Sequence, residues 1–323
     1  MLKNYHHLTN DLRCQIYILK RRGESVTQIS KELGVHRSTI YRELKRNSGK
    51  RGYRYKQANE KALKRRLCAS KRKRKMTRKT ISMIRKKLNL QWSPVQISGW
   101  LKRIGYKKFV SPEMIYQYIW RDKANKGFLY KNLGHSGKKY NKRSKGMAGR
   151  GCIPHRVEID KRPKIVEQKT RLGDWELDTI IGTEQSGAIV SIVDRASKLT
   201  KLVKVFRRTS QEVTDALIRG LRPLKKFVLT LTADNGKEFA NHQKVSEILK
   251  AEFYFAKPDH SWERGLNEHT NGLVRQYFPK TKRFDEISEE ELMKVEILLN
   301  NRPRKVLKFE SPIEVFNRLS KAA

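Results

Sequence analysis

The chain has 323 residues, and its 74 Lys and Arg against 32 Asp and Glu give a formal net charge of +42. This excess excludes an ordinary metabolic enzyme, because the charge repels itself unless a polyanion such as nucleic acid shares it. A hydrophobic content of 37% excludes a wholly disordered chain. Cys14, Cys68 and Cys152 form no CxxC pair, and no apolar run approaches the roughly 20 residues of a membrane span. We therefore expect a cytoplasmic protein with no zinc ribbon and no disulfide framework.

The positive charge is concentrated in the first half of the chain. Residues 1–160 hold 43 Lys and Arg and 9 Asp and Glu, a net charge of +34. Residues 161–323 carry a net charge of only +8. The first half is therefore expected to hold the polyanion, and the second half is where chemistry should be sought.

Residues 1–50 are predicted to form a helix-turn-helix domain. Apolar residues recur at helical spacing in three short segments between residues 8 and 46, and Gly34 allows a sharp turn before the third segment. The third helix presents side chains that donate to phosphates and purine edges, as a major-groove helix requires. We expect these DNA-binding residues to be Arg37, Ser38, Thr39, Tyr41, Arg42, Lys45 and Arg46.

Between this domain and the second half lie two linkers and a second helical unit. Residues 51–75 are predicted to be a basic linker, since residues 71–80 hold seven basic side chains in ten. Residues 76–121 contain three short helices, two of which open with the Ser-Pro pair typical of a helix start. They are interpreted as a second DNA-binding module, with a dimerisation or spacer bundle as the alternative. Residues 122–165 are expected to be a basic, Gly-rich linker.

Residues 166–323 are predicted to form an α/β core. Strands are expected at 174–182, 188–194, 200–206, 227–232 and 252–256, and helices at 210–221, 242–250 and 264–277. Three strands followed by alternating helices and strands indicate a mixed sheet with helices on its faces.

Three acids in this core are candidates for chemistry. The topology allows the first strand to lie beside the fourth, which would bring Asp178 next to Asp234 at the end of the fourth strand. Two carboxylates held so close repel each other unless a cation lies between them. Glu268 is chosen as the third acid, on a helix, with 33 residues between it and Asp234. Asp174 and Glu263 are the competing acids.

Several strings in the chain match a known family more closely. HRSTIYRELKRN, RLGDWELDTI, TADNGKEF and WERGLNEHTNGLVRQYFPK together resemble the IS30 family of bacterial insertion-sequence transposases, over nearly the whole chain. The order of elements and the spacing of the acids resemble the ribonuclease-H-like mixed-sheet catalytic core of DDE transposases and retroviral-type integrases. One departure is His36, which stands where many relatives have Ser as the cap of the recognition helix.

The resemblance implies a transposase that binds the inverted-repeat ends of its insertion sequence and catalyses metal-dependent DNA cleavage and strand transfer. Asp178, Asp234 and Glu268 would then be the catalytic acids and the ligands of two Mg²⁺ or Mn²⁺ ions, which suit carboxylate oxygens. The substrates would be the element ends and target DNA in the bacterial nucleoid, and joining two ends implies a homo-oligomer. Supporting roles are expected for Trp262, Arg264, Asn271 and Arg275.

The main alternative is a sequence-specific DNA-binding regulator with an inactive nuclease-like domain. An ATP-driven remodeller is disfavoured because the chain has no G-x-x-x-x-G-K-[ST] loop. A tyrosine recombinase would need a covalent nucleophile, and Tyr277 lies on the predicted inward face of its helix.

Overall fold

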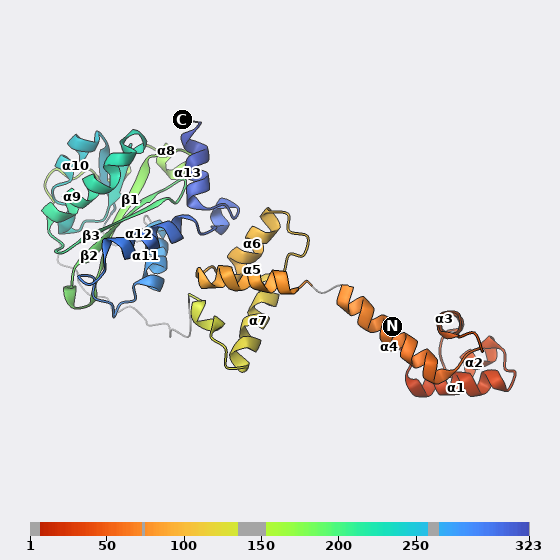
Figure 1. Ribbon diagram of the computed structural model, residues 1–323. Helices are drawn as coiled ribbons and strands as arrows, with labels where there is room; N and C mark the ends of the chain where they lie inside the picture. The colour runs from red at the N-terminus through yellow and green to blue at the C-terminus, as the bar shows by residue number, and fades with distance from the viewer. Residues whose placement is uncertain (1–6, 73–74, 135–152, 258–264, 323) are drawn as a thin grey trace. The chain divides into compact units, whose positions relative to one another are not determined.

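The computed structural model describes residues 7–72, 75–134, 153–257 and 265–322 (Figure 1). These residues fall into two compact units, Met1–Thr77 and Arg78–Ala323. In the described part of the chain, no helix is long and apolar enough to cross a membrane.

The N-terminal unit begins with three helices, α1 (Asn10–Arg21), α2 (Val26–Glu32) and α3 (Arg37–Asn47). Each helix buries one stripe of apolar residues in a shared core, and Ile16, Ile29 and Ile40 are almost completely inaccessible to solvent. The hydroxyl groups of Thr9 and Ser25 accept hydrogen bonds from the first turns of α1 and α2. The three helices agree with the sequence-based prediction.

A fourth helix, α4 (Tyr55–Arg72), occupies most of the segment that the sequence predicts to be a linker. Its Ala58 is buried in the core of the N-terminal unit. Lys61 Nζ donates to the Ser48 carbonyl at 2.9 Å, and Arg65 Nη1 donates to the Arg46 carbonyl at 3.2 Å. The last carbonyls of a helix lack partners within it and favour nearby cations, so these side chains stabilise the end of α3. The basic residues of this segment therefore belong to a helix that packs within the N-terminal unit.

The second unit opens with α5 (Arg78–Asn89), α6 (Pro94–Arg103) and α7 (Pro112–Ala124). These are the three helices expected in the second helical module. The hydroxyl group of Ser93 accepts from the Gln96 amide, and that of Ser111 accepts from the Met114 amide, so both Ser-Pro pairs cap a helix.

A five-stranded sheet forms the centre of this unit. Its strands are β1 (Asp174–Ile181), β2 (Ala188–Asp194), β3 (Thr200–Val205), β4 (Thr230–Ala233) and β5 (Glu252–Phe255), in the spatial order β3-β2-β1-β4-β5. Neighbours among β1, β2 and β3 run antiparallel, whereas β4 runs parallel to β1 and β5 parallel to β4. Parallel strands need crossover connections, which α9 (Ser210–Leu221) and α10 (His242–Leu249) provide. This is the mixed sheet predicted from the sequence.

Shorter helical segments complete the unit. They are α8 (Ile165–Gln168) and the 3₁₀ turns Leu129–Asn132, Ile159–Lys161, Thr183–Gln185, Arg222–Phe227, η5 (Lys237–Phe239) and Lys305–Leu307.

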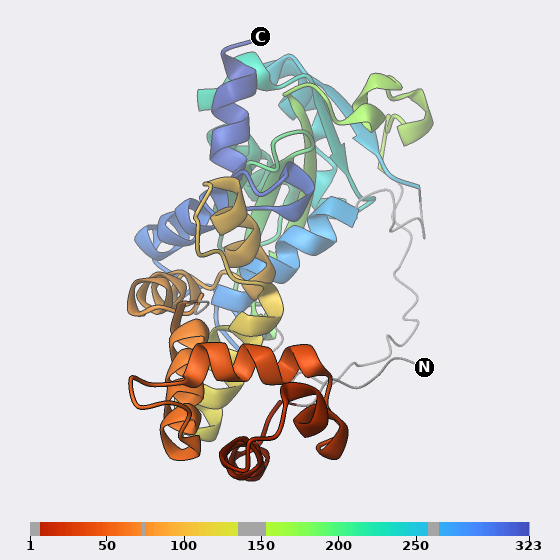
Figure 2. The same cartoon turned by 90° about the vertical axis from the view of Figure 1, so that its right-hand side faces the viewer.

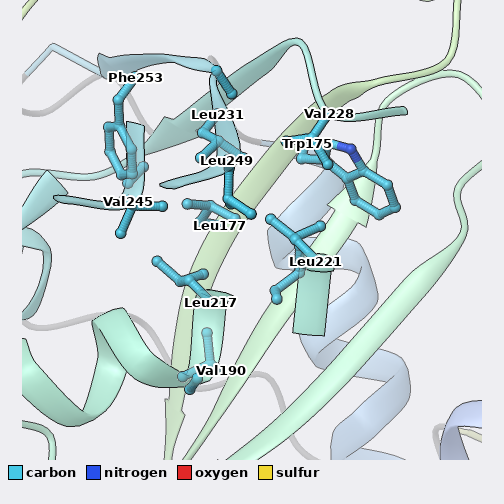
Figure 3. Close-up of a cluster of buried hydrophobic side chains, with 14 of the residues drawn as sticks. Trp175, Leu177, Val190, Leu217, Leu221, Val228, Leu231, Val245, Leu249 and Phe253 are labelled. Carbon is cyan, nitrogen blue, oxygen red and sulfur yellow. The ribbon is translucent and has the colours of Figure 1, made fainter. Parts of the chain in front are cut away.

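One face of the sheet packs against α9 and α10 in the larger hydrophobic core. Trp175 and Leu177 of β1 point into this core, where Leu217 of α9 and Leu249 of α10 meet them (Figure 3). Because side chains alternate along a strand, Glu176 and Asp178 belong to the opposite face.

The opposite face is covered by α11 (Gly265–Tyr277) and α12 (Glu289–Asn300). Ile180 of β1, Val274 of α11 and Leu299 of α12 are buried together there. Helix α11, light blue in the figures, lies against β1 and β2 (Figure 2). The helix that carries Glu268 and the strand that carries Asp178 are therefore packed on each other.

The second helical module is fastened to the C-terminal part of the same unit. Both terminal nitrogens of Arg103 in α6 donate to the Glu314 carboxylate at 3.0 Å, at the start of α13 (Pro312–Ser320). The hydrogen bonds from Arg103 lower the pKa of Glu314 to about 2. Gly99 of α6 lies directly against the Phe309 ring. Module and core are thus joined by an ion pair and a close packed contact.

A methyl group at Gly99 would overlap the Phe309 ring. We expect Gly99→Ala to lower the free energy of unfolding by about 1–3 kcal/mol, because an overpacked contact must shift. Urea unfolding of the full chain measures this loss. Gly272→Ala is the matched control: this exposed helical glycine has nothing within 4 Å of an added Cβ, so no loss is expected. Unchanged stability of Gly99→Ala would contradict the described packing.

Candidate active site and DNA interface

The register of β1 and β4 brings Asp178 and Asp234 to the same level of the sheet. The paired positions run from Asp174 with Thr230 to Glu176 with Thr232. Continuing that register by two residues sets Asp178 beside Asp234, which directly follows the end of β4. Alternation along β1 directs the Asp178 side chain to the face that α11 covers, where Asn271 of that helix bonds it. The predicted β1–β4 neighbourhood is observed, and the proximity of the two acids stays a prediction.

An amide on α11 holds the Asp178 carboxylate. Asn271 Nδ2 donates to Asp178 Oδ2 at 2.7 Å, while Asn271 Oδ1 accepts from the Ser191 hydroxyl at 2.9 Å. Because both ends of the amide are engaged, its orientation is defined. Asn267, one turn earlier, is buried and donates to the Leu177 carbonyl at 2.9 Å. The helix is therefore bonded to β1 immediately beside the candidate acid.

Glu268 lies on the first turn of α11, three residues before Asn271, and is exposed. Residues three apart share a helix face, so Glu268 is carried on the side of α11 that meets Asp178. Within the described ranges, which omit residues 258–264 just before α11, no three His, Cys, Asp or Glu side chains are grouped so that they could hold a metal ion. The β1–β4 pairing thus ends two residues before Asp178 and Asp234, and Glu268 lies on the helix that packs on β1.

Of the four residues predicted to support the site, two lie within the described part of the chain and two lie outside it. Asn271 contacts Asp178 as described above. Arg275 Nη2 donates to the Ile181 carbonyl at 2.6 Å and its guanidinium lies over the Phe284 ring, so it holds the end of β1. Burial lowers the pKa of Arg275. Trp262 and Arg264 lie outside the described residues.

The other acids of these strands have structural partners. Asp174 is fully buried; two nitrogens of Arg171 donate to it at 3.0 Å, and the Thr230 hydroxyl donates at 2.8 Å. Asp194 accepts from the Gly173 amide at 3.0 Å and from the Ser197 hydroxyl at 2.6 Å. Burial raises the pKa of Asp194. Both acids thus brace the beginning of β1 and the turn after β2.

Sequence reasoning missed four residues of this region. All four form hydrogen bonds within or beside the site; they are Ser191, Asn267, Thr179 and Glu238. The spacing of Asn267 and Asn271, four residues apart on a helix with few other polar core positions, was a usable signal. Glu238 lies in the string TADNGKEF and offered only its proximity to Asp234 in sequence.

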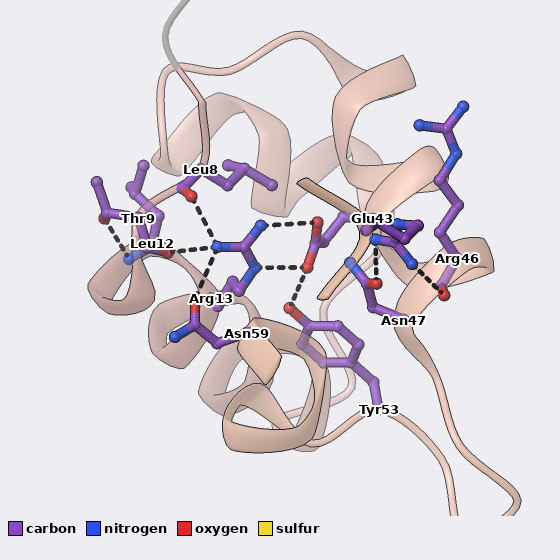
Figure 4. Close-up of polar contacts among 10 residues, drawn as sticks. Leu8, Thr9, Leu12, Arg13, Glu43, Arg46, Asn47, Tyr53 and Asn59 are labelled. Atoms are coloured by element: carbon purple, nitrogen blue, oxygen red, sulfur yellow. Dashed lines mark hydrogen bonds and ion pairs between the residues drawn. The ribbon is translucent and has the colours of Figure 1, made fainter. Parts of the chain in front are cut away.

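In the N-terminal unit, a buried ion pair anchors the predicted recognition helix α3 (Figure 4). Arg13 of α1 and Glu43 of α3 are both buried, and Arg13 Nε donates to Glu43 Oε1 at 2.8 Å. Arg13 Nη1 also donates to the Leu8 carbonyl at 2.7 Å, and the Tyr53 hydroxyl donates to Glu43 at 3.2 Å. Burial is the main cause of the raised pKa of Tyr53. This network sets how α3 is presented to solvent.

The solvent-facing side of α3 is strongly basic. Five of the seven predicted DNA-binding residues are exposed: Arg37, Tyr41, Arg42, Lys45 and Arg46. The other two, Ser38 and Thr39, are partly exposed. His36 caps this helix, since its Nδ1 accepts from the Ser38 amide at 3.2 Å. The imidazole therefore performs the capping role at the start of α3.

Known proteins resemble the chain over nearly its whole length. Residues 4–47 match the helix-turn-helix domain family. The chain is 44% identical over 315 residues to the transposase for insertion sequence element IS4351 of Bacteroides fragilis, covering 97% of this chain and 96% of that one. It is 34% identical over 325 residues to transposase InsI for insertion sequence element IS30A of Escherichia coli K12, covering 97% and 84%. The transposase for IS1086 of Cupriavidus metallidurans is 35% identical over 324 residues, covering 96% and 94%.

Among solved structures, the catalytic core domain of BIV integrase matches with a TM-score of 0.37 and 19% identity, covering 46% of this chain and 95% of that one. A chain of the simian T-cell lymphotropic virus intasome in complex with PP2A regulatory subunit B56 gamma matches with a TM-score of 0.39 and 17% identity, covering 45% and 54%.

A helix-turn-helix unit and a mixed-sheet core, in a chain related to transposases over its whole length, define a DNA-binding transposase, an enzyme that cuts DNA and transfers strands. The chain belongs to the IS30 family of insertion-sequence transposases. The predicted family is confirmed, as are the helix-turn-helix domain and the mixed-sheet core, and the relatives do not favour an inactive regulator.

Breaking the buried ion pair of the N-terminal unit tests its anchoring role. We expect Glu43→Ala to destabilise this unit by about 3–5 kcal/mol, because Arg13 would remain buried without its acid. Hydrogen exchange of the α3 amides in the full chain measures the loss. Glu32→Ala, at an exposed acid of α2, is the control and should leave exchange unchanged. Equal protection of α3 in both variants would contradict the anchoring role.

Proposed function

We propose that the chain is a metal-dependent DNA phosphoryl transferase of the DDE type, with Asp178, Asp234 and Glu268 as its catalytic acids. The observation that supports this proposal is the parallel β1–β4 register, whose continuation by two residues would bring Asp178 beside Asp234, together with the bond from Asn271 of α11 to Asp178. The spacing to Glu268 and the family membership support the third acid.

The donors fit Mg²⁺ or Mn²⁺. Asp178, from β1, and Asp234, from the turn after β4, offer carboxylate oxygens, the ligand type that hard divalent cations prefer. Two negative groups so placed also repel each other in the absence of a cation. We propose that these acids, with Glu268, hold two such ions, which when bound would supply activation of the attacking oxygen and stabilisation of the leaving oxyanion.

The residues around the catalytic acids would act by holding these acids in place and aligning them. Asn271 fixes the orientation of the Asp178 carboxylate, and Arg275 fixes the end of β1 that follows it. With the acids held, water attacks a phosphodiester at the element end, the P–O bond to the 3′ oxygen breaks, and a free 3′-OH remains. That hydroxyl then attacks the phosphorus of a target phosphodiester in line: the element's 3′ oxygen joins the phosphorus as the target's own P–O bond to its 3′ oxygen breaks, which leaves a free target 3′-OH. No residue of the chain becomes joined to DNA.

The basic helices would hold the substrates. We propose that α3 reads the inverted-repeat ends in the major groove and that α5 to α7 contact further phosphates, using exposed cations such as Lys86, Lys102 and Lys108. The working complex must bring two element ends together with target DNA in the bacterial nucleoid, so at least two copies of the chain would take part.

Neutralising the acids tests the catalytic assignment. We expect Asp178→Asn, Asp234→Asn and Glu268→Gln each to reduce strand transfer by about 100-fold or more, since several kcal/mol of transition-state stabilisation are lost. End cleavage and joining of labelled oligonucleotides in Mg²⁺ or Mn²⁺ measure the rates. DNA affinity should stay near wild type, and the exposed-acid control Asp215→Asn should remain active. Wild-type transfer by any of the three variants would refute the assignment.

Removing cations from α3 tests the DNA interface. We expect the triple variant of Arg37→Ala, Arg42→Ala and Lys45→Ala to lose specific end binding. Its affinity should also depend less steeply on salt, because fewer phosphates are neutralised and fewer counterions are released on binding. Mobility shifts over a range of salt concentrations measure both. Lys20→Ala, at an exposed cation of α1, is the control. Unchanged end affinity in the triple variant would remove α3 as the reading helix.

A further inference from the structure

Behind the two candidate acids, a threonine and a glutamate form a bond that the proposed mechanism does not use. Thr179 follows Asp178 in β1, so its side chain belongs to the opposite face of the sheet. Its hydroxyl donates to Glu238 Oε1 at 2.9 Å. Glu238 lies in η5, four residues after Asp234, and only 6% of its surface is exposed. Arg208 Nη1 lies 3.7 Å from the same oxygen.

This bond occurs where the strand pairing no longer connects the two acid-bearing segments. The paired positions of β1 and β4 stop at Glu176 and Thr232, two residues before the acids. Beyond that point β4 ends and the chain turns through Asp234 and Gly236 into η5. The Thr179–Glu238 bond is therefore a direct side-chain connection between the end of β1 and the turn that carries Asp234.

Gly236 brings Glu238 and Asp234 together within that turn. The Gly236 amide donates to Asp234 Oδ1 at 3.0 Å. A Cβ built on Gly236 would meet the Glu238 carboxylate and would lie 2.9 Å from Asp234 Oδ1. The two carboxylates thus approach the same glycine, so a movement of Glu238 is expected to move the Asp234 turn with it.

We propose that Glu238 is a positioning residue that sets the placement of Asp234 relative to Asp178 through its bond to Thr179. This inference rests on the proposed catalytic role of Asp178 and Asp234. On this inference, Glu238 affects the turnover rate by aligning the two acids, and it does not contact DNA.

The test compares Thr179→Val with Thr179→Ser in the full-length chain. Valine keeps the size of the side chain but removes the donor, whereas serine keeps the hydroxyl. We expect Thr179→Val to lower the turnover rate of strand transfer at least 10-fold, with the KM for end DNA within about 2-fold of wild type, because small misplacements of reacting groups are costly. Thr179→Ser should restore most of the rate. A purely structural role in folding would not produce this separation of turnover rate from KM.

A double-mutant cycle tests whether both residues act through one bond. Glu238→Ala alone should slow transfer to a similar degree, and the variant carrying both Thr179→Val and Glu238→Ala should be no slower than the slower single variant. Glu247→Ala, at an exposed acid of α10, is the control and should transfer like wild type. Thermal melts identify any variant that fails to fold, and the Val and Ser pair at position 179 still decides the outcome if Glu238→Ala does so.

The outcomes separate this inference from the proposed function. Wild-type transfer by Thr179→Val, or independent effects that multiply fully in the double variant, would overturn the positioning role even if Asp178→Asn is inactive. Active Asp178→Asn and Asp234→Asn variants would instead overturn the proposed function on which it rests.

Discussion

The parallel pairing of β1 with β4 is the constraint on which the candidate site depends. Adjacent strands lie about 4.8 Å apart, and equal steps along both strands keep side chains on the same face. Continued by two residues, the register that pairs Asp174 with Thr230 would bring Asp178 beside Asp234. Their mutual repulsion disfavours this arrangement unless hydrogen bonds or cations oppose it. The Asn271 amide at one carboxylate and the Gly236 amide at the other supply two such bonds.

The remaining parts of the chain are attached to this centre by polar contacts between distant segments. Ser191 orients the Asn271 amide, and Asn271 then ties α11 to β1. Arg103 and Glu314 join the second helical module to the end of the core. In the N-terminal unit, Arg13 and Glu43 fix the buried side of α3 and leave its basic side exposed. In each of these contacts, a hydrogen-bonded or buried polar side chain orients the helix or strand that carries it.

Sequence patterns predict local structure well where an apolar period or a cap is present. The strand alternation around Asp178 and the Ser-Pro starts at Ser93 and Ser111 correspond to β1, α6 and α7. The sequence pattern does not reveal helix α4 in the segment predicted to be a linker, because that segment is dominated by Lys, Arg and other polar residues, with a weak apolar stripe. The stability of α4 comes from Ala58 in the core and from the cations that it places at the end of α3, and a local pattern does not contain those contacts.

The sequence by itself determined the unequal charge of the two halves, the mixed-sheet class, the family and the set of candidate acids, because these depend on composition, local periodicity and matching strings. Only the tertiary structure decided the register that aligns Asp178 with Asp234, the Asn271 bond to Asp178, and the Thr179–Glu238 connection behind them. These contacts join residues 56 to 93 positions apart. Their partners are selected by how strands and helices pack, which no short segment of the chain specifies.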